Sequence, residues 1–145
     1  MSNSFSYEIK KELSELNNLA KKNEVRYELL GYLSSANIEI LKSKLKFVTE
    51  NEYNINRFGK LLKNVDINDF KIDLQGKVYI ITTKIPEISI KLADANEVEC
   101  RAFVRGIFLG SGSINNPENK YHLEIKIINN NLMHELIELL KRILY

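Results

Sequence analysis

The chain has 145 residues, of which 44% are hydrophobic and 28% are charged, a composition typical of one soluble globular domain. Its net charge of +2 gives no strong basic field, so any affinity for nucleic acid depends on where the 21 lysines and arginines lie. The single cysteine excludes an internal disulfide, and no apolar run reaches the roughly 20 residues of a membrane span. We therefore expect a cytoplasmic protein without a membrane segment.

Hydrophobic periodicity predicts the elements of the first part of the chain. Apolar residues at helical spacing indicate three helices, over residues 5–21, about 23–35 and 55–65. Alternation with a period of two indicates two hairpins, with strands 37–41 and 44–49, then 70–73 and 77–83. Pro86 then begins a short helix or turn that runs to Leu92.

The second part of the chain begins with a helix start signal. Asn96 followed by Glu99 forms a capping-box pattern ahead of an apolar run. Strands are predicted near residues 113–115 and 121–127, and a helix from Asn131 to the end. Because the chain ends inside an apolar helix, the pattern favours a truncated chain over a complete domain.

The chain contains one pattern twice. Residues 26–40 read RYELLGYLSSANIEI and residues 101–115 read RAFVRGIFLGSGSIN, with Gly31 and Gly106 75 positions apart. The match resumes at an offset of 78, where Leu45, Phe47, Phe58 and Leu62 pair with Leu123, Ile125, Leu136 and Leu140. We expect two halves related by a pseudo-two-fold axis, over about 5–92 and 96–145, the second lacking its second hairpin.

Small residues recur four positions apart in the repeated helix. They are Gly31 and Ser35 in the first half and Gly106 and Gly110 in the second. Residues at this spacing share one helical face, and small side chains there let two backbones approach closely. We therefore expect the helices over 24–35 and 97–110 to pack against each other through these four residues.

The repeated stretches LLGYLSSAN (29–37) and VRGIFLGSG (104–112) resemble the LAGLIDADG motifs of homing endonucleases. The chain is more similar still to the bacterial WhiA family of sporulation and cell-division regulators, through SFSYEIKKELSEL, VYIITTK and CRAFVRGIFLGSGSINNPENKYHLEI. The resemblance implies an α+β, LAGLIDADG homing-endonuclease-like fold with two pseudo-symmetric αββαββ-type halves, the second truncated. It also implies one domain over residues 1–145, with the family's helix-turn-helix domain absent.

The resemblance argues against catalysis. In active homing endonucleases the penultimate position of each motif is acidic, and the two carboxylates hold divalent metals that activate water. Ala36 and Ser111 stand at these positions, and neither supplies the charged oxygen ligands that Mg²⁺ prefers. Glu39 lies near the first motif but has no acidic counterpart in the second half. We therefore expect a protein that is not an enzyme and that holds no metal and no cofactor.

Other chemistries have weaker support. His122 and His134 have no Cys or His at metal-ligand spacing, so neither is predicted to be a ligand. Cys100 has no histidine nearby in sequence, which favours a bystander over a nucleophile. The GSGS sequence at 110–113 follows a helix rather than opening one, so we interpret it as a helix cap rather than a phosphate-binding loop.

The remaining candidate is a sheet surface. The LAGLIDADG resemblance implies that helices cover one sheet face and that the other forms a saddle on the duplex. Strand alternation then directs Leu45, Phe47, Val78, Ile80, Leu123 and Ile125 toward the helices. Glu124 and Ile81 are predicted to face outward, which weakens the case for DNA. The candidate nucleic-acid-binding residues on or near the saddle are Lys42, Lys44, Lys46, Lys71, Lys77, Tyr79, Thr83, His122 and Lys126.

Three functions stay open. The first is a non-catalytic, DNA-binding transcriptional regulator domain of WhiA type, nucleoid-associated and linked by family resemblance to sporulation or cell division and chromosome segregation. Its partner would be double-stranded DNA in the full-length protein. The second is a protein-interaction domain that recruits a partner and does not itself bind DNA. The third is a residual metal-dependent nuclease, which the missing carboxylates make the weakest. No membrane partner and no small-molecule substrate are expected.

Overall fold

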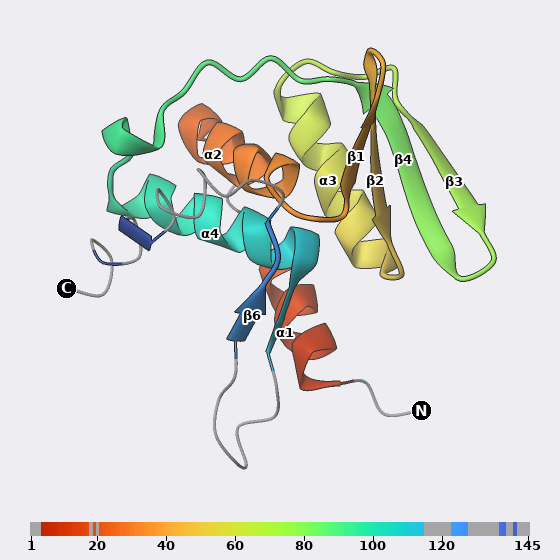
Figure 1. The fold of residues 1–145 in the computed structure, drawn as a ribbon, viewed down its shortest axis with the longest axis horizontal. Coiled ribbons are helices and arrows are strands. Elements are labelled where there is room, and N and C mark those ends of the chain that lie inside the picture. Colours follow the sequence, from red (N-terminus) through yellow and green to blue (C-terminus); the bar gives the residue numbers. More distant parts are fainter. Residues whose placement is uncertain are drawn as a thin grey trace.

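The structure is a computed structural model that describes residues 4–17, 19, 21–114, 123–127, 137–138 and 141 (Figure 1). Its helices are α1 (Phe5–Ser14), α2 (Lys22–Leu33), α3 (Glu52–Asn64), the short 3-10 helix η1 (Leu92–Asp94) and α4 (Glu97–Ser111). Its strands are β1 (Ile38–Leu41), β2 (Lys44–Thr49), β3 (Lys71–Gln75), β4 (Val78–Lys84), β5 (Gly112–Ile114) and β6 (Leu123–Ile125). The predicted helices and hairpins of the first half, and the helix and hairpin that begin the second, occur in the predicted order. The predicted final helix lies largely outside the described residues.

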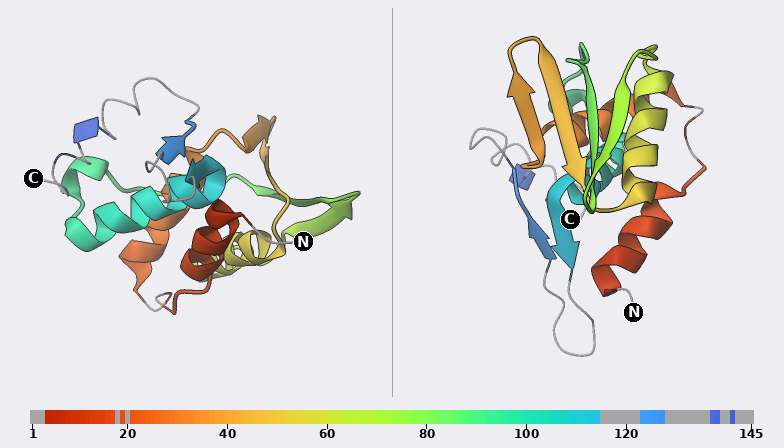
Figure 2. Two further views of the ribbon diagram at one scale, coloured as in Figure 1. Left: turned by 90° about the horizontal axis from the view of Figure 1, so that it is seen from below. Right: turned by 90° about the vertical axis from the view of Figure 1, so that its right-hand side faces the viewer.

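Two antiparallel sheets follow the two repeated helices. The first has four strands in the order β1-β2-β4-β3, and the second pairs β5 with β6. Helix α3 packs on β2 and β4, so one face of the larger sheet is covered and the other is open. The two views of Figure 2 show the larger sheet beside α3 and the small hairpin beside the end of α4.

Two predicted segments differ from the structure. Helix α1 ends at Ser14 rather than near residue 21. Arg57 Nη1 donates hydrogen bonds to the carbonyl oxygens of Ser14 and Leu16, at 3.4 and 2.7 Å, in place of the N–H groups of a further helical turn. The predicted short helix or turn from Pro86 to Leu92 is wrong, since the chain between β4 and η1 has no regular secondary structure. That segment instead connects two hydrophobic clusters. Ile88 packs against the cluster between the larger sheet, α2 and α3, and Ile90 packs against a second cluster, which contains Tyr27 of α2 and Phe103 of α4.

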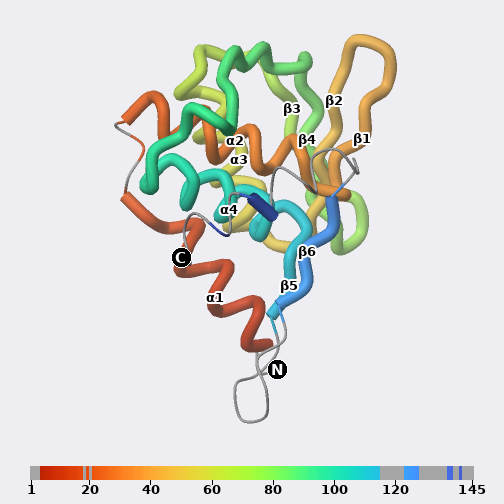
Figure 3. The backbone as a smooth tube through the Cα atoms, turned by 60° about the vertical axis from the view of Figure 1, so that its left-hand side comes forward, coloured from red at the N-terminus to blue at the C-terminus, as the bar shows by residue number. Residues whose placement is uncertain are grey.

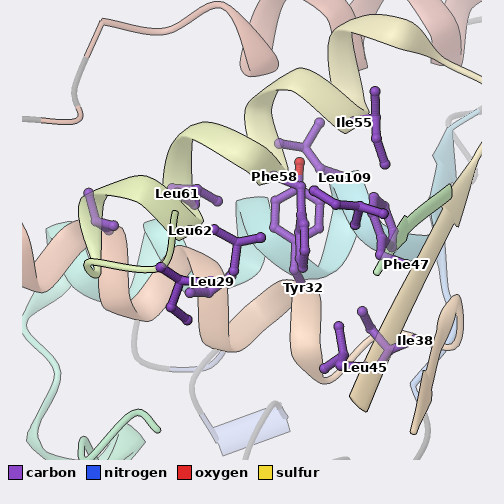
Figure 4. Packing of buried hydrophobic residues seen from close by; sticks show 13 residues of the cluster. Leu29, Tyr32, Ile38, Leu45, Phe47, Ile55, Phe58, Leu61, Leu62 and Leu109 are labelled. Carbon is purple, nitrogen blue, oxygen red and sulfur yellow. The ribbon is translucent and has the colours of Figure 1, made fainter. Parts of the chain in front are cut away.

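The first core lies between the larger sheet and helices α2 and α3 (Figure 4). Three aromatic rings form its centre, with centroid separations of 5.3 Å for Tyr32 and Phe47, 5.2 Å for Tyr32 and Phe58, and 4.9 Å for Phe47 and Phe58. Leu45 and Phe47 point to the helices, as predicted. Leu109 of α4 also belongs to this cluster, so the second half completes the core of the first.

A polar connection crosses the same core. The Tyr32 hydroxyl donates to Asn54 Oδ1 at 2.5 Å, and Asn54 Nδ2 donates to the carbonyl oxygen of Leu109 at 2.6 Å. These three residues come from α2, α3 and α4 respectively. Because Tyr32 and Asn54 are both buried, the hydrogen bonds satisfy groups that would otherwise be costly to remove from water. The connection fixes the three helices relative to one another.

Helices α2 and α4 lie side by side (Figure 3). They approach most closely at their glycines. A Cβ added at Gly31 would lie against the carbonyl oxygen of Phe103 and 2.8 Å from Ile107 N. A Cβ added at Gly106 would lie against the carbonyl oxygen of Glu28 and 3.0 Å from Gly31 Cα. One turn later, a Cβ at Gly110 would lie 2.5 Å from Ser35 Cβ. Glycine is therefore required at Gly31 and Gly106, where backbone packs directly on backbone, while Gly110 packs on the side chain of Ser35.

Beside this contact, one buried carboxylate is shared by two arginines. Glu28 of α2 accepts from Arg57 Nε at 2.7 Å and Nη2 at 2.8 Å, and from Arg105 Nε at 2.6 Å. The side chains of Glu28 and Arg57 are each 1% exposed, and that of Arg105 is 13% exposed. Burial alone lowers the pKa of Arg57, but the hydrogen bonds and charge of Glu28 outweigh it, so the pKa is raised and the guanidinium stays charged.

The first prediction tests the helix contact. Gly106→Ala places a methyl group against the backbone of Glu28, which cannot move without separating α2 from α4, so we expect a loss of about 1–3 kcal/mol or more in unfolding free energy. Gly59→Ala in α3 is the matched control, because its Cβ would meet only the edge of the Phe70 ring at 3.3 Å. Urea denaturation measures both. Equal stability of the two variants would contradict the required close approach.

The second prediction tests the shared carboxylate. Glu28→Gln leaves two buried guanidinium groups without their anion, so we expect a loss of about 3–5 kcal/mol in unfolding free energy. Glu97→Gln is the control, because Glu97 and Arg101 form a pair whose side chains are 64% and 62% exposed. Such exposed pairs contribute about 0–1 kcal/mol. A similar small loss in both variants would show that Glu28 carries no special electrostatic role.

Candidate nucleic-acid interface

The open face of the larger sheet carries lysines from three strands. Residues directly opposite each other in an antiparallel pair share a face. Lys44 of β2 lies opposite Lys84 of β4, while Thr82 of β4 lies opposite Lys46 on one side and Lys71 of β3 on the other. Lys46 alternates with the buried Leu45 and Phe47, so this set faces away from the helices.

These lysines lie toward one end of the sheet, the upper end in Figure 1. Lys44 begins β2, Lys84 ends β4 and Lys71 begins β3. Lys42 occupies the turn between β1 and β2 with a φ of 58°, a left-handed conformation, and its side chain is exposed. We call Lys42, Lys44, Lys46, Lys71 and Lys84 the basic end of the sheet.

The open face is not uniformly basic. Glu39 of β1 lies opposite Lys46, within the basic end, and Asp73 of β3 lies opposite Ile80. Ile80 is also opposite Val48, so an apolar pair occupies the middle of the strands, although Ile80 is only 9% exposed. The open face therefore has a cationic end that includes one acidic residue, and a middle that is apolar and acidic.

The predicted orientation of β4 is wrong. Ile81 lies opposite Phe47, and Thr83 lies opposite Leu45, so both face the helices, where they are 0% and 1% exposed. Tyr79 lies on that same face, and its hydroxyl donates to Glu52 of α3 at 3.4 Å. Burial, followed by the charge of Glu52, raises the pKa of Tyr79. Tyr79 and Thr83 are therefore not on the open face.

The physical reason is that β4 has no clear alternation of polar and apolar residues. Its sequence, VYIITTK, contains apolar side chains at both parities, so the pattern alone does not fix which side is buried. The register with β2 determines which side of β4 is buried, because Ile81 and Thr83 lie opposite the buried Phe47 and Leu45. Val78 and Ile80, predicted to face the helices, lie on the opposite face of β4 with Thr82 and Lys84, although Ile80 is buried there, at 9% exposed.

The other predicted residues are dispersed. Lys77 lies in the turn before β4, at the opposite end of the strands from the basic end. Lys126 is exposed and follows β6, which belongs to the smaller sheet. His122 lies outside the described residues. Sequence reasoning also missed Lys84, which shares the parity of Thr82 and ends its strand.

The two motif ends meet through hydrogen bonds. The backbone N–H of Ala36 is shared between Ser111 Oγ at 3.2 Å and the carbonyl oxygen of Lys126 at 3.1 Å. The Ser111 hydroxyl donates in turn to that same carbonyl oxygen. Asn37 Nδ2 donates to the carbonyl oxygen of Gly110 at 2.7 Å. A neutral hydroxyl and backbone groups therefore occupy the junction between the halves.

The described part of the chain has no group of three or more His, Cys, Asp or Glu side chains that could hold a metal ion. In the same residues, no helix has both the length and the apolar character to cross a membrane.

Comparison with known proteins defines the class of this fold. The crystal structure of I-DmoI in complex with DNA and Mn aligns with 84% of this chain and 78% of that chain, with a TM-score of 0.57 and 18% identity. At this identity the likeness shows the fold alone, which is that of the LAGLIDADG homing endonucleases. The predicted fold class is confirmed.

The family follows from closer matches. The family model described as WhiA LAGLIDADG-like domain matches residues 100–144. The crystal structure of the N-terminal LAGLIDADG domain of DUF199/WhiA aligns with 98% of this chain and 75% of that chain, with a TM-score of 0.83 and 25% identity. A protein of Pediococcus pentosaceus, named "Probable cell division protein WhiA", is 39% identical over 103 residues, which are 68% of this chain and 30% of the relative.

The chain therefore belongs to the WhiA family, as a LAGLIDADG-like domain of the WhiA type. It covers less than a third of the length of the curated relatives that it matches.

Proposed function

We propose that this chain is a DNA-binding, non-catalytic domain of a WhiA-type transcriptional regulator, and that the basic end of its sheet contacts the phosphate backbone. The observation that carries the proposal is the row in which Lys46, Thr82 and Lys71 lie opposite one another on three neighbouring strands, beside the pair Lys44 and Lys84. Cations placed on one rigid face supply the sequence-independent part of DNA affinity.

The residues of this row differ in the role that their side chains can take. Neighbouring strands lie about 4.8 Å apart, so Lys46 and Lys71 are separated by roughly 10 Å, with Thr82 between them. Lysines contact phosphates and set the position of the protein on the duplex, while a threonine hydroxyl can hydrogen-bond to a base edge. We expect Thr82 to be the residue of this row that affects sequence preference.

The comparisons support the same proposal. I-DmoI, which shares the fold, is bound to DNA in its crystal structure, and the curated WhiA relatives are named as cell division proteins. We propose that the full-length protein acts at the nucleoid in sporulation or in cell division and chromosome segregation, with residues 1–145 as one LAGLIDADG-like domain. The protein-interaction hypothesis remains the alternative, and the observation that favours it is Leu41, which is 50% exposed and lies opposite Lys44 on the open face.

The third prediction tests the proposed absence of catalysis. Ala36 and Ser111 provide no carboxylate where active homing endonucleases hold their metals, and Ser111 is engaged with Ala36 and Lys126. We expect no cleavage of supercoiled or linear duplex DNA with Mg²⁺ or Mn²⁺. Chelator-sensitive nicking that survives repurification of the chain, and that changes with substitution of Ser111, would overturn this part of the proposal.

The fourth prediction tests the basic end. Changing Lys44, Lys46, Lys71 and Lys84 together to Gln should weaken binding to every duplex tested, with little change in sequence preference. Each lost phosphate contact should reduce the magnitude of the slope of log affinity against log salt by roughly 0.9. Fluorescence anisotropy with duplexes of unrelated sequence, over a range of salt, measures both quantities.

The matched control changes Lys11, Lys21, Lys60 and Lys91 to Gln. These four exposed lysines lie on helices or loops outside the larger sheet, and the variant has the same net charge because it also loses four lysines. Both variants should remain folded, because exposed substitutions usually shift stability by less than about 0.5 kcal/mol; Lys46 is half-buried, so thermal unfolding of the test variant checks that it remains folded. If the two sets weaken DNA binding equally, the effect is one of total charge and the sheet face is not the interface. If neither changes binding, the protein-interaction reading replaces the DNA reading.

A further inference from the structure

Strand β3 forms one outer edge of the larger sheet, at the right of Figure 1. It pairs with β4 from Lys71 to Gln75 without a bulge, and all of its side chains are exposed. No described strand pairs with its other side, so every second residue directs its backbone N–H and C=O groups away from the sheet. A free edge of this kind can pair with a strand of another chain unless a proline, a bulge or an unfavourable charge prevents it.

The face of β3 that turns toward the helices is apolar and exposed. Ile72 lies opposite Ile81, and Leu74 lies opposite Tyr79, so both are on the helix side of the sheet. Helix α3 packs on β2 and β4, farther in, and it leaves Ile72 43% exposed and Leu74 59% exposed. A groove of about 230 Å³ lies between α3 and the start of β3, with Phe70 and Ile72 in its wall. An apolar stripe along a free edge is typical of a strand that pairs with another chain.

The sequence of β3 fits an antiparallel copy of itself. If Ile72 lies opposite Ile72 of a second copy, Lys71 of each copy lies opposite Asp73 of the other. Within one chain, Lys71 lies opposite Thr82 and Asp73 lies opposite Ile80, so β4 offers neither of them an opposite charge. A register centred on Asp73 would instead place two carboxylates together. The charges of β3 therefore favour the register centred on Ile72, in which Lys71 and Asp73 each gain a partner of opposite sign.

We propose that β3 pairs with β3 of a second copy of this chain, antiparallel and centred on Ile72, so that two four-stranded sheets join into one. Leu74 of each copy then lies opposite Phe70 of the other, on the apolar face. The two α3 helices are about four strand spacings apart, roughly 19 Å, which exceeds the width of a helix with its side chains, about 10–12 Å. The helices therefore do not collide. The pairing involves no nucleic acid, so it goes beyond the proposed function and does not depend on it.

Sedimentation equilibrium of the 145-residue chain, without DNA, measures the association. Because the contact is one short strand from each copy, we expect a monomer–dimer equilibrium with a Kd between about 10 µM and about 1 mM. Asp73→Lys replaces two opposite-charge pairs with two like-charge pairs and should weaken the association about tenfold or more. Asp94→Lys is the matched control, because it makes the same charge change on the exposed surface of η1 and should leave the association unchanged.

Exchanging the two charges provides a rescue. Lys71→Asp combined with Asp73→Lys again places opposite charges across the contact, so this variant should associate as the parent does. All the substituted side chains are exposed, so the variants should remain folded, which circular dichroism checks. A parent chain that stays monomeric over the whole concentration range, or an exchanged variant as weak as Asp73→Lys, would overturn the proposal.

Cysteine cross-linking tests the register. Residues directly opposite each other in antiparallel strands have Cβ atoms about 4.5–5.5 Å apart, so Ile72→Cys should form a disulfide-linked dimer on mild oxidation. Leu74→Cys is the control: that position is more exposed, but it would lie four residues out of register with its own copy, roughly 14 Å away, and should link poorly. The native Cys100 is 1% exposed and does not compete. Equal linking through both positions, or linking through Leu74→Cys alone, would contradict the proposed pairing.

Discussion

The close approach of α2 and α4 is the constraint on which the rest of this structure depends. At Gly31 and Gly106 the two backbones are near enough that a single added methyl group would lie against a carbonyl oxygen. This contact sets the separation of the two halves, and it places Glu28 where guanidinium groups from both α3 and α4 reach it. It also brings the ends of both helices together, so that Ala36, Ser111 and Lys126 form one hydrogen-bonded junction. A larger helix separation would remove all of these interactions together.

Buried polar contacts, including the shared carboxylate of Glu28, join the helices of the two halves in addition to their apolar packing. Leu109 of α4 lies in the core of the first half, and Asn54 of α3 binds its carbonyl oxygen. Arg57, also from α3, binds Glu28 of α2 and the carbonyls that follow α1. Polar groups in a core must find specific partners, whereas apolar side chains tolerate several arrangements. The buried network therefore selects one relative position of α1, α2, α3 and α4 from those that hydrophobic burial alone would allow.

Much of this fold could be predicted from the sequence because the same pattern occurs in both halves, so that each copy could be checked against the other. The positions of Gly31 and Gly106 were visible as matched small residues, and the pattern of Leu45 and Phe47 correctly gave the buried face of β2. The same reasoning failed for β4, where VYIITTK offers apolar residues at both parities and only pairing with β2 decides the face. It also missed the role of Glu28 and Arg57. Their signal was present, since each is a charged residue within the apolar stripe of its helix, but their pairing joins positions 29 residues apart.

The junction between the halves shows how a fold of this class can exist without the charge that metal binding requires. Two carboxylates at adjacent motif ends would repel each other unless a cation lay between them. With Ala36 and Ser111 at those positions, a hydroxyl and two backbone groups satisfy one another, so the junction is neutral. What such a scaffold retains is its open sheet face, where Glu39 and Asp73 lie among the lysines. Because those lysines gather at one end, phosphate contacts there would fix the orientation of the domain on a duplex while giving only part of the affinity. Sequence recognition would then have to come from few side chains on this face, or from other parts of a longer protein.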